Sequence, residues 1–223
     1  MIPWVCLDTA NVPGGGELKL MRRGAEFSIM SGAIELMNSR LSGSEKALAM
    51  LAGDRIRNRP RLQMLIGGLG MGFTLGAALA DLPSDASVTV AELVPAVVAW
   101  ARGPMAHIFG QSLTDPRVTV RVIDVATEIG SATSAYDTIL LDVDNGPGGL
   151  SRDDNDRLYS AAGLQAARRA LRPGGVLAVW SAAPSEAFTR RLGSAGFQAE
   201  TVQVRATGGR RGARHVIWLA TSR

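Results

Sequence analysis

A glycine-rich loop between an apolar strand and a helix constrains this chain more than any other feature. The apolar run at residues 62–66 leads into Gly68, Gly70 and Gly72, and a helical stretch follows. Glycines here let the backbone turn sharply out of a buried strand and approach a ligand where a Cβ would clash. A second apolar strand ends at Glu92, about 20 residues on, where a ribose would present its hydroxyl groups. This order indicates a nucleotide pocket.

Beyond Pro60 the chain alternates between predicted strands and helices. Short apolar runs, typical of parallel strands covered on both faces, lie at residues 62–66, 88–91, 118–122, 138–141 and 176–180. Helical stretches are predicted around residues 74–80, 96–109 and 158–171, the last ended by residues 172–175, and two further strands at residues 200–206 and 215–220. The pattern predicts an α/β fold with a doubly wound, mostly parallel seven-stranded sheet.

The N-terminal region has a different pattern. Residues 18–22, 27–30 and 34–37 read as short strands of a β hairpin or meander. From residue 43 the apolar spacing becomes helical, with Ser44 as the expected cap. We therefore expect a β appendage over residues 1–42 and a nucleotide-binding catalytic domain over residues 43–223.

Composition narrows the class of protein. With 223 residues and 46% hydrophobic content, the chain can bury one good core. The single Cys6 cannot form an internal disulfide, so we expect a reducing, cytoplasmic setting. No segment approaches the ~20 apolar residues that a bilayer requires, and we expect neither export nor a membrane span. The net charge is +4, but the basic residues are scattered, which disfavours nucleic acid as a partner.

One basic cluster, at residues 208–214, stands between the last two predicted strands. It is read as an exposed hairpin tip, with contact to an anionic substrate or an RNA phosphate as the alternative.

Acidic residues follow three successive predicted strands. Glu92, Asp124 and the pair Asp142 and Asp144 should meet in one crevice, because the carboxyl ends of parallel strands share one edge of a sheet. Each acid alone could instead cap a helix or open a turn. Asp142 is the strongest single candidate for a functional residue, since Asp144, Asn145 and a glycine-rich loop follow it. A partly desolvated carboxylate there could take a proton from an amine or anchor an ammonium group.

Other catalytic classes find little support. His107 and His215 have no second histidine or cysteine at ligand spacing, so we expect no metal site. The chain has no Gly-x-Ser-x-Gly elbow and no Gly-Lys-Ser phosphate loop, which disfavours a serine hydrolase and a P-loop nucleotidase.

From about residue 18 onward the chain resembles the spermidine-synthase-like branch of the class I S-adenosylmethionine-dependent methyltransferase fold. The segments that carry the likeness are residues 27–36, Ser44 with Glu45, the glycine loop, the acids and Leu-Arg-Pro-Gly-Gly-Val-Leu at 171–177. The resemblance implies that Glu92 holds the ribose and Asp124 meets the adenine amino group. Asp142 would deprotonate or orient an amine nucleophile. The full set of expected cofactor-binding residues is Gly67, Gly68, Gly70, Gly72, Glu92, Leu93, Asp124, Val125 and Asp142, and the expected catalytic residues are Asp142, Asp144 and Asn145.

The residues that depart from the family pattern affect which form of the cofactor the chain is expected to prefer. Gly70 stands where aminopropyltransferases carry an aspartate, and a tyrosine of the family is replaced near Gly43 or Ser44. Asn145 stands at the place of a second aspartate, unless Asp144 substitutes for it. The lost loop acid would bind the bare ammonium of decarboxylated S-adenosylmethionine and repel the carboxylate of S-adenosylmethionine. We therefore expect methyl or related alkyl transfer from S-adenosylmethionine to a small acceptor. We expect this acceptor to be an amine.

Three alternatives stay open. The first is aminopropyl transfer from decarboxylated S-adenosylmethionine to a polyamine. The second is an NAD-dependent oxidoreductase, which shares a glycine loop and a ribose acid, although no Tyr-x-x-x-Lys pair is present. The third is a non-catalytic nucleotide-binding protein. A homodimer is also left open.

Overall fold

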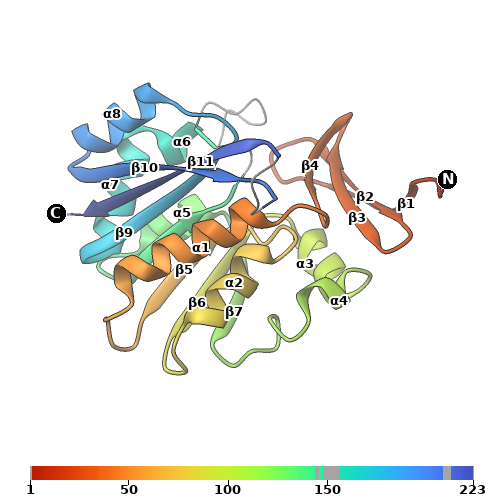
Figure 1. Cartoon of the computed structure of the whole chain (residues 1–223), viewed down its shortest axis with the longest axis horizontal. Coiled ribbons are helices and arrows are strands. Elements are labelled where there is room, and N and C mark those ends of the chain that lie inside the picture. The colour runs from red at the N-terminus through yellow and green to blue at the C-terminus, as the bar shows by residue number, and fades with distance from the viewer. Residues whose placement is uncertain (1, 144–145, 148–155, 208–211, 223) are drawn as a thin grey trace.

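Two β-sheets organise the chain, and Figure 1 shows them side by side. The structure is a computed structural model that describes residues 2–143, 146–147, 156–207 and 212–222. The strands of the larger sheet are β5 (Gln63–Gly67), β6 (Ser87–Glu92), β7 (Val118–Val122), β8 (Tyr136–Leu141), β9 (Leu171–Ser181), β10 (Phe197–Arg205) and β11 (Arg214–Ser222). Their order is β10-β11-β9-β8-β5-β6-β7. Strands β5 to β9 pair in parallel, whereas β10 and β11 are antiparallel, which confirms the predicted seven-stranded, mostly parallel sheet.

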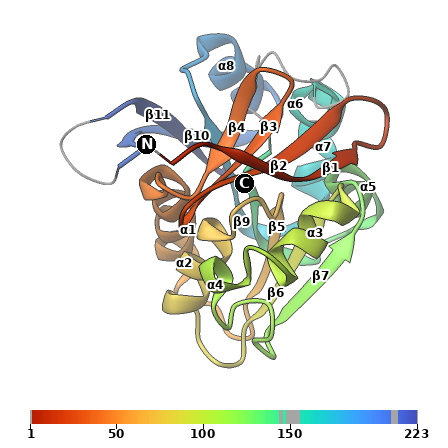
Figure 2. The ribbon, with the colours of Figure 1, turned by 90° about the vertical axis from the view of Figure 1, so that its right-hand side faces the viewer.

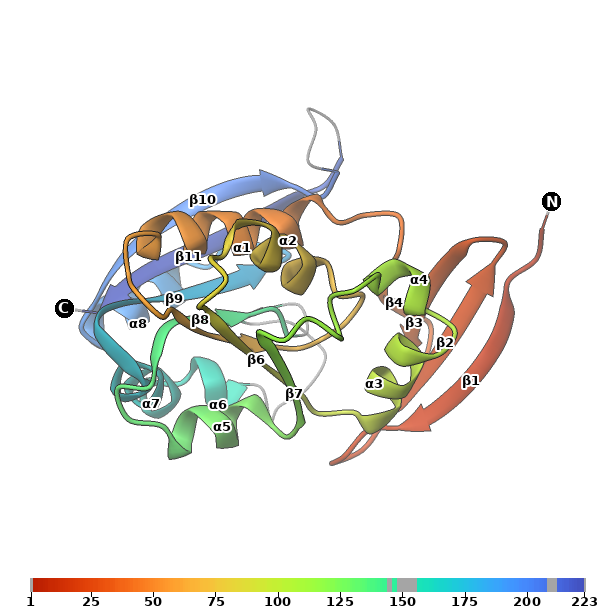
Figure 3. The ribbon, with the colours of Figure 1, turned by 90° about the horizontal axis from the view of Figure 1, so that it is seen from below.

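Helices cover both faces of this sheet. One apolar core is formed with α1 (Gly43–Ile56), α2 (Phe73–Asp81) and α3 (Pro95–Arg102), and the other with α5 (Val125–Ser131), α7 (Ala161–Ala170) and α8 (Glu186–Ser194). Figure 3 shows α1 and α2 on one face and α5 and α7 on the other. Burial on two faces explains why β8 is apolar or hydrogen-bonded along its whole length, with every residue buried.

Two predicted helices are interrupted. The helix expected over residues 96–109 is divided into α3 and α4 (Ala106–Phe109), because Pro104 disfavours a helical conformation at Gly103. The helix expected over residues 158–171 is divided into α6 (Asp156–Tyr159) and α7. Ser160 caps α7 by accepting a hydrogen bond from the Gly163 N–H at 3.1 Å.

Three further details differ from the sequence prediction. Ser44 lies inside α1, and the residue before the helix is Ser42. The residues at 172–175, expected to end a helix, belong to the start of β9. Helices α5 and α8 had not been predicted.

The smaller sheet precedes α1. Its antiparallel strands follow chain order as β1 (Val5–Asn11), β2 (Glu17–Arg23), β3 (Glu26–Ser31) and β4 (Ile34–Asn38). The last three confirm the predicted strands, and β1 is additional. Leu18 and Leu20 alternate with exposed residues on β2 and join the main core. Figure 2 shows this sheet lying across one end of the larger sheet. A domain division at residue 42 stays a prediction.

Candidate active site

The glycine loop follows β5 and leads into α2. Gly68, Gly70 and Gly72 have positive φ angles of 89°, 50° and 77°. A Cβ on Gly68 would lie 2.6 Å from the backbone oxygen of Asp142, and one on Gly72 would lie 2.3 Å from the Phe109 ring. Glycine is therefore required both by conformation and by close approach. The loop brings the start of α2 beside the end of β8.

Glu92 is buried at the end of β6 and fastens this loop. Its Oε2 accepts a hydrogen bond from the Leu69 N–H at 2.9 Å, and its Oε1 accepts one from the Val94 N–H at 2.8 Å. Burial raises the pKa of Glu92 above its usual range, although these backbone bonds act in the opposite direction. The backbone N–H groups of Gly70 and Leu93 also lower the pKa of this carboxyl group, so the loop and the turn after β6 both hold the side chain.

Asp142 follows β8 and meets the first turn of α2. Its Oδ2 lies 2.6 Å from Oγ1 of Thr74, which is also 3.4 Å from the carbonyl oxygen of Glu45. Burial raises the pKa of Asp142 to about 7; the hydrogen bond from Thr74 opposes this rise, and the negative charge of Glu45 adds to it. A carboxyl group whose pKa lies near neutrality can exchange a proton at neutral pH.

Asp124 follows β7 and caps α5. Its Oδ1 accepts a hydrogen bond from the Ala126 N–H at 2.7 Å. The capping reading of this residue is therefore confirmed. It does not exclude a second role, because Asp124 is exposed and also lines the cavity described next.

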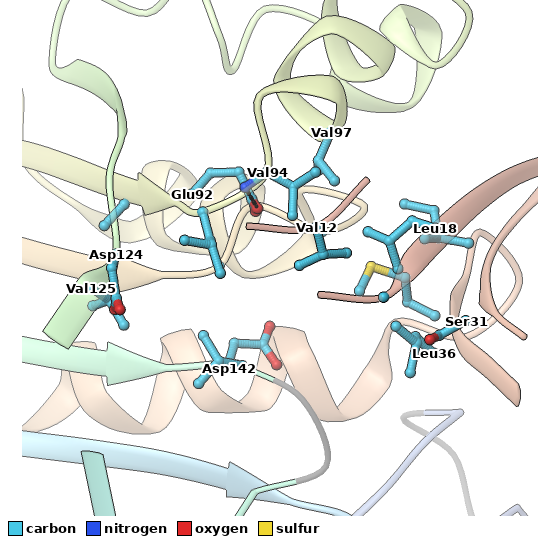
Figure 4. Close-up of a pocket in the computed structure, with 18 of the residues that line it drawn as sticks. Val12, Leu18, Ser31, Leu36, Glu92, Val94, Val97, Asp124, Val125 and Asp142 are labelled. Carbon is cyan, nitrogen blue, oxygen red and sulfur yellow. Dashed lines mark hydrogen bonds between the residues drawn. The ribbon is translucent and has the colours of Figure 1, made fainter. Parts of the chain in front are cut away.

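One cavity gathers the acids from the ends of β6, β7 and β8. It has a volume of about 180 Å³, opens to solvent, and is lined by Glu92, Asp124 and Asp142. Figure 4 shows these three acids on one side and Val12, Leu18, Ser31 and Leu36, from the N-terminal region, on the other. The other predicted residues on its lining are Gly68, Gly70, Leu93 and Val125. The described lining residues include no lysine or arginine.

A second cavity adjoins the first. The two share Leu36, Met37, Gly70 and Asp142 on their linings. The polar side chains of the second cavity are those of Glu35, Asn38, Ser44, Glu45, Asp142, Trp180 and His215. No lysine or arginine is among its described lining residues either.

Glu35 is neutralised in this second cavity by an ion pair with Arg40, whose Nη2 lies 3.0 Å from Oε1. The indole N–H of Trp180 is buried and, within the part of the chain that the structure describes, has no hydrogen-bond partner. A buried donor without a partner is rare in proteins and is commonly satisfied by a bound molecule or by water.

Not every predicted residue lies on these cavities. Gly72 lines the second cavity, and Gly67 packs beneath the loop, where a Cβ would lie 2.9 Å from Val125. Asp144 and Asn145 lie outside the described residues. Within the described ranges, no group of histidine, cysteine, aspartate and glutamate side chains could hold a metal ion. None of the helices described is long and apolar enough for a bilayer crossing.

Four residues that the structure brings to the site were not among the predicted site residues, although Trp180 could have been expected to border a ligand or to fill the core. Thr74 contacts Asp142, Met37 lies between the two cavities, and His215 and Trp180 meet in the second. Thr74 had a signal, since it directly follows the glycine loop. His215 had none, because its partner Ser44 lies 171 positions away in the chain.

Sequence comparison finds relatives over about half of the chain. The chain is 34% identical over 119 residues to putrescine N-methyltransferase 1 of Nicotiana tabacum, and the match covers 53% of this chain and 30% of the relative. It is 32% identical over 125 residues to a polyamine aminopropyltransferase of Nitrosomonas europaea, covering 56% and 36%. The match thus spans about a third of the length of these curated relatives. No family model matches the chain.

Structural comparison covers nearly all of the chain. A spermidine synthase from Thermotoga maritima superposes with a TM-score of 0.78 at 17% identity, covering 98% of this chain and 73% of that protein. At this identity the likeness concerns the fold. The chain thus has the fold of spermidine synthases, and over about half of its length its sequence is similar to putrescine N-methyltransferases and a polyamine aminopropyltransferase.

Proposed function

We propose that this chain is a transferase that uses an adenosyl sulfonium cofactor to transfer a methyl or related alkyl group to a small amine. The observation that carries the proposal is the first cavity, where Glu92, Asp124 and Asp142 line one space above a glycine loop. The curated relatives, named as putrescine N-methyltransferases and a polyamine aminopropyltransferase, support the same chemistry.

Each acid has a distinct part in this proposal. Glu92 holds the ribose hydroxyls and Asp124 the adenine amino group, both as acceptors of hydrogen bonds. Asp142 lies on both cavities, so it orients the transferable end of the cofactor toward the nucleophile. A bound sulfonium supplies a leaving group that is already activated by its positive charge. The protein then contributes mainly position and exclusion of water.

The charges of the second cavity support an amine acceptor. Glu45 and Asp142 line it, Glu35 is paired with Arg40, and none of the described lining residues is basic. A cavity with this balance attracts a cation and disfavours an anion. A primary amine, protonated in solution, fits these charges.

One observation favours aminopropyl transfer as a second candidate. S-adenosylmethionine carries a carboxylate, and the described lining of the first cavity offers it no lysine or arginine. Decarboxylated S-adenosylmethionine lacks that group and would need no such partner. Against this, Gly70 removes the loop acid that would select the decarboxylated form. The two observations point in opposite directions, so the cofactor must be measured.

A turnover assay tests the proposal. The protein is incubated with putrescine and either S-adenosylmethionine or decarboxylated S-adenosylmethionine, and products are identified by mass spectrometry. We expect an N-methylated amine with the first cofactor; an N-aminopropylated amine with the second would establish the alternative. Binding of NADH in preference to either cofactor would instead support an oxidoreductase.

For the cell compartment we propose the cytoplasm, supported by the exposed thiol of Cys6, which is free in the structure. An exposed free thiol persists best where the surroundings are reducing. We propose a small molecule, and not nucleic acid, as the substrate.

A further inference from the structure

A chain of hydrogen bonds crosses the wall of the second cavity, from α1 to β11. Oγ of the buried Ser44 donates to Oε2 of Glu45 at 2.7 Å, and Nδ1 of His215 lies 2.9 Å from the same Oγ. All three residues line the cavity. The ring of His215 also meets the edge of Trp180, with centroids 4.8 Å apart and planes at 77°. Both contacts fix the plane of the imidazole.

The network assigns the tautomer of His215. A hydroxyl group has one proton, and an ionised carboxylate can only accept, so Ser44 donates to Glu45. The oxygen of Ser44 must then accept from His215, which places a proton on Nδ1. In a neutral ring with Nδ1 protonated, Nε2 carries the free lone pair. Because Nδ1 is turned to Ser44, Nε2 is the nitrogen left for a molecule in the cavity.

The surroundings keep this ring neutral. Burial lowers the pKa of His215, while the negative charge of Glu45 acts in the opposite direction. The other ionisable groups on the cavity are Asp142, at the end of β8, and Glu35 of β4, which is paired with Arg40. In the antiparallel register of β10 and β11, His215 lies opposite Val204, and the neighbouring Arg214 lies opposite Arg205.

We propose that His215, oriented by Ser44 and Glu45, is the base that takes the proton from the acceptor amine; this inference rests on the proposed function. The protonated amine gives one proton to Nε2 and becomes a neutral nucleophile. Its lone pair then forms the new nitrogen–carbon bond while the electrons of the carbon–sulfur bond leave with sulfur. The imidazolium then loses its proton to solvent, which restores the neutral imidazole. Asp142 acts on the cofactor side of the same amine.

The number of histidines makes the inference directly measurable. The chain has two, His215 and His107, and His107 is exposed against the ring of Phe27. Nuclear magnetic resonance can therefore titrate both rings in one sample. We expect His215 to be neutral at pH 7, with its proton on Nδ1. Saturating S-adenosylhomocysteine with putrescine should shift the Nε2 resonance of His215 and leave that of His107 unchanged.

Substitutions at these residues test the proposed proton transfer through the turnover rate. His215→Gln should lower kcat for putrescine about 10²- to 10⁴-fold, the usual contribution of a general base, while the Kd for S-adenosylhomocysteine stays the same. Ser44→Ala should lower kcat less than His215→Gln does. It should also shift the tautomer of His215, so that part of the protein carries the ring proton on Nε2 instead of Nδ1. His107→Gln is the matched control and should keep the full rate.

The outcomes separate this inference from the proposed function. If His215→Gln keeps full turnover, or if putrescine leaves the His215 resonances of the cofactor-loaded protein unmoved, His215 is not the base. If His215→Gln loses S-adenosylhomocysteine binding as well, its role is structural and the inference is again overturned. If the unaltered protein does not bind S-adenosylhomocysteine, the proposed function itself fails.

Discussion

At the scale of single residues, Thr74 tunes the acid that joins the two cavities. Its hydroxyl group bonds to Asp142 and opposes the effect of burial, which raises the pKa of Asp142; with both effects present this pKa is about 7. We predict that Thr74→Val raises the pKa of Asp142 further, because the bond to the carboxylate is lost. Carbon-13 resonances of the carboxyl groups measure this directly. Thr74→Ser, which keeps the hydroxyl, should behave as the unaltered protein; an unchanged pKa in Thr74→Val would show that the bond is weak.

Asp142 also links stability to pH. The folded protein holds its proton up to about pH 7, whereas an unfolded chain releases it near pH 4. The folded state therefore binds more protons between these values, and the free energy of unfolding should fall as pH rises from 4 to 7. Asp142→Asn removes this loss. Relative to the unaltered protein it should gain on the order of 1–3 kcal/mol between pH 4.5 and pH 8. Urea unfolding at both values checks this, and parallel stability curves would contradict it.

Gly70 is the position at which we predict selection between the two cofactor tails. A Cβ at this position would lie 3.0 Å from Sδ of Met37, and φ is positive, which aspartate and asparagine tolerate better than most residues. We predict that Gly70→Asp shifts the ratio of Kd values on the order of tenfold toward decarboxylated S-adenosylmethionine. Gly70→Asn has the same shape without the charge and should leave the ratio unchanged. Equal ratios in both variants, measured by calorimetry, would mean that residue 70 does not face the cofactor tail.

At the scale of elements, the junction between the loop and α2 depends on one glycine. Gly72→Ala would place a Cβ 2.3 Å from the Phe109 ring at a positive φ, and we expect a loss of about 1–3 kcal/mol in stability. Gly76→Ala, four residues later inside α2, meets only Ser112 at 3.8 Å and should gain about 0.5–1 kcal/mol. Thermal or chemical unfolding of the two variants gives the comparison. A loss in both, or in neither, would contradict this account of the junction.

Elements were predictable where local pattern decides them. The apolar runs of β5 to β9 and the glycine loop predict a parallel sheet with a site at one edge. Strand β1 escaped prediction because its residues are mostly exposed and lack a buried alternation. The break between α3 and α4 carried a signal in Gly103 and Pro104, but apolar spacing continued across it and outweighed the signal.

The site was predictable only in part, for a related reason. Glu92, Asp124 and Asp142 stand at strand ends, so the parallel topology alone brings them to one cavity. Contacts such as those of His215 with Ser44 and Trp180 depend on how α1 packs beside β9 and β11. No spacing in the sequence encodes that packing.

At the scale of the whole molecule, the two sheets together line the first cavity. The larger sheet supplies the acids, and the small sheet supplies apolar residues such as Leu18 and Ile29 on the opposite wall. Trp100 of α3 ties them by donating a hydrogen bond from Nε1 to Asp8 at 2.7 Å. The small sheet is therefore a wall of the site.

Calorimetric titration of the unaltered protein with S-adenosylhomocysteine, and separately with NADH, tests the central claim most directly. The cavity of Glu92, Asp124 and Asp142 should bind the adenosyl thioether and not the dinucleotide. Glu92→Gln, checked for folding by circular dichroism, should weaken thioether binding by about 1–3 kcal/mol through loss of charge-assisted hydrogen bonds. Binding of NADH with no response to S-adenosylhomocysteine, or equal thioether binding by folded Glu92→Gln, would contradict the account.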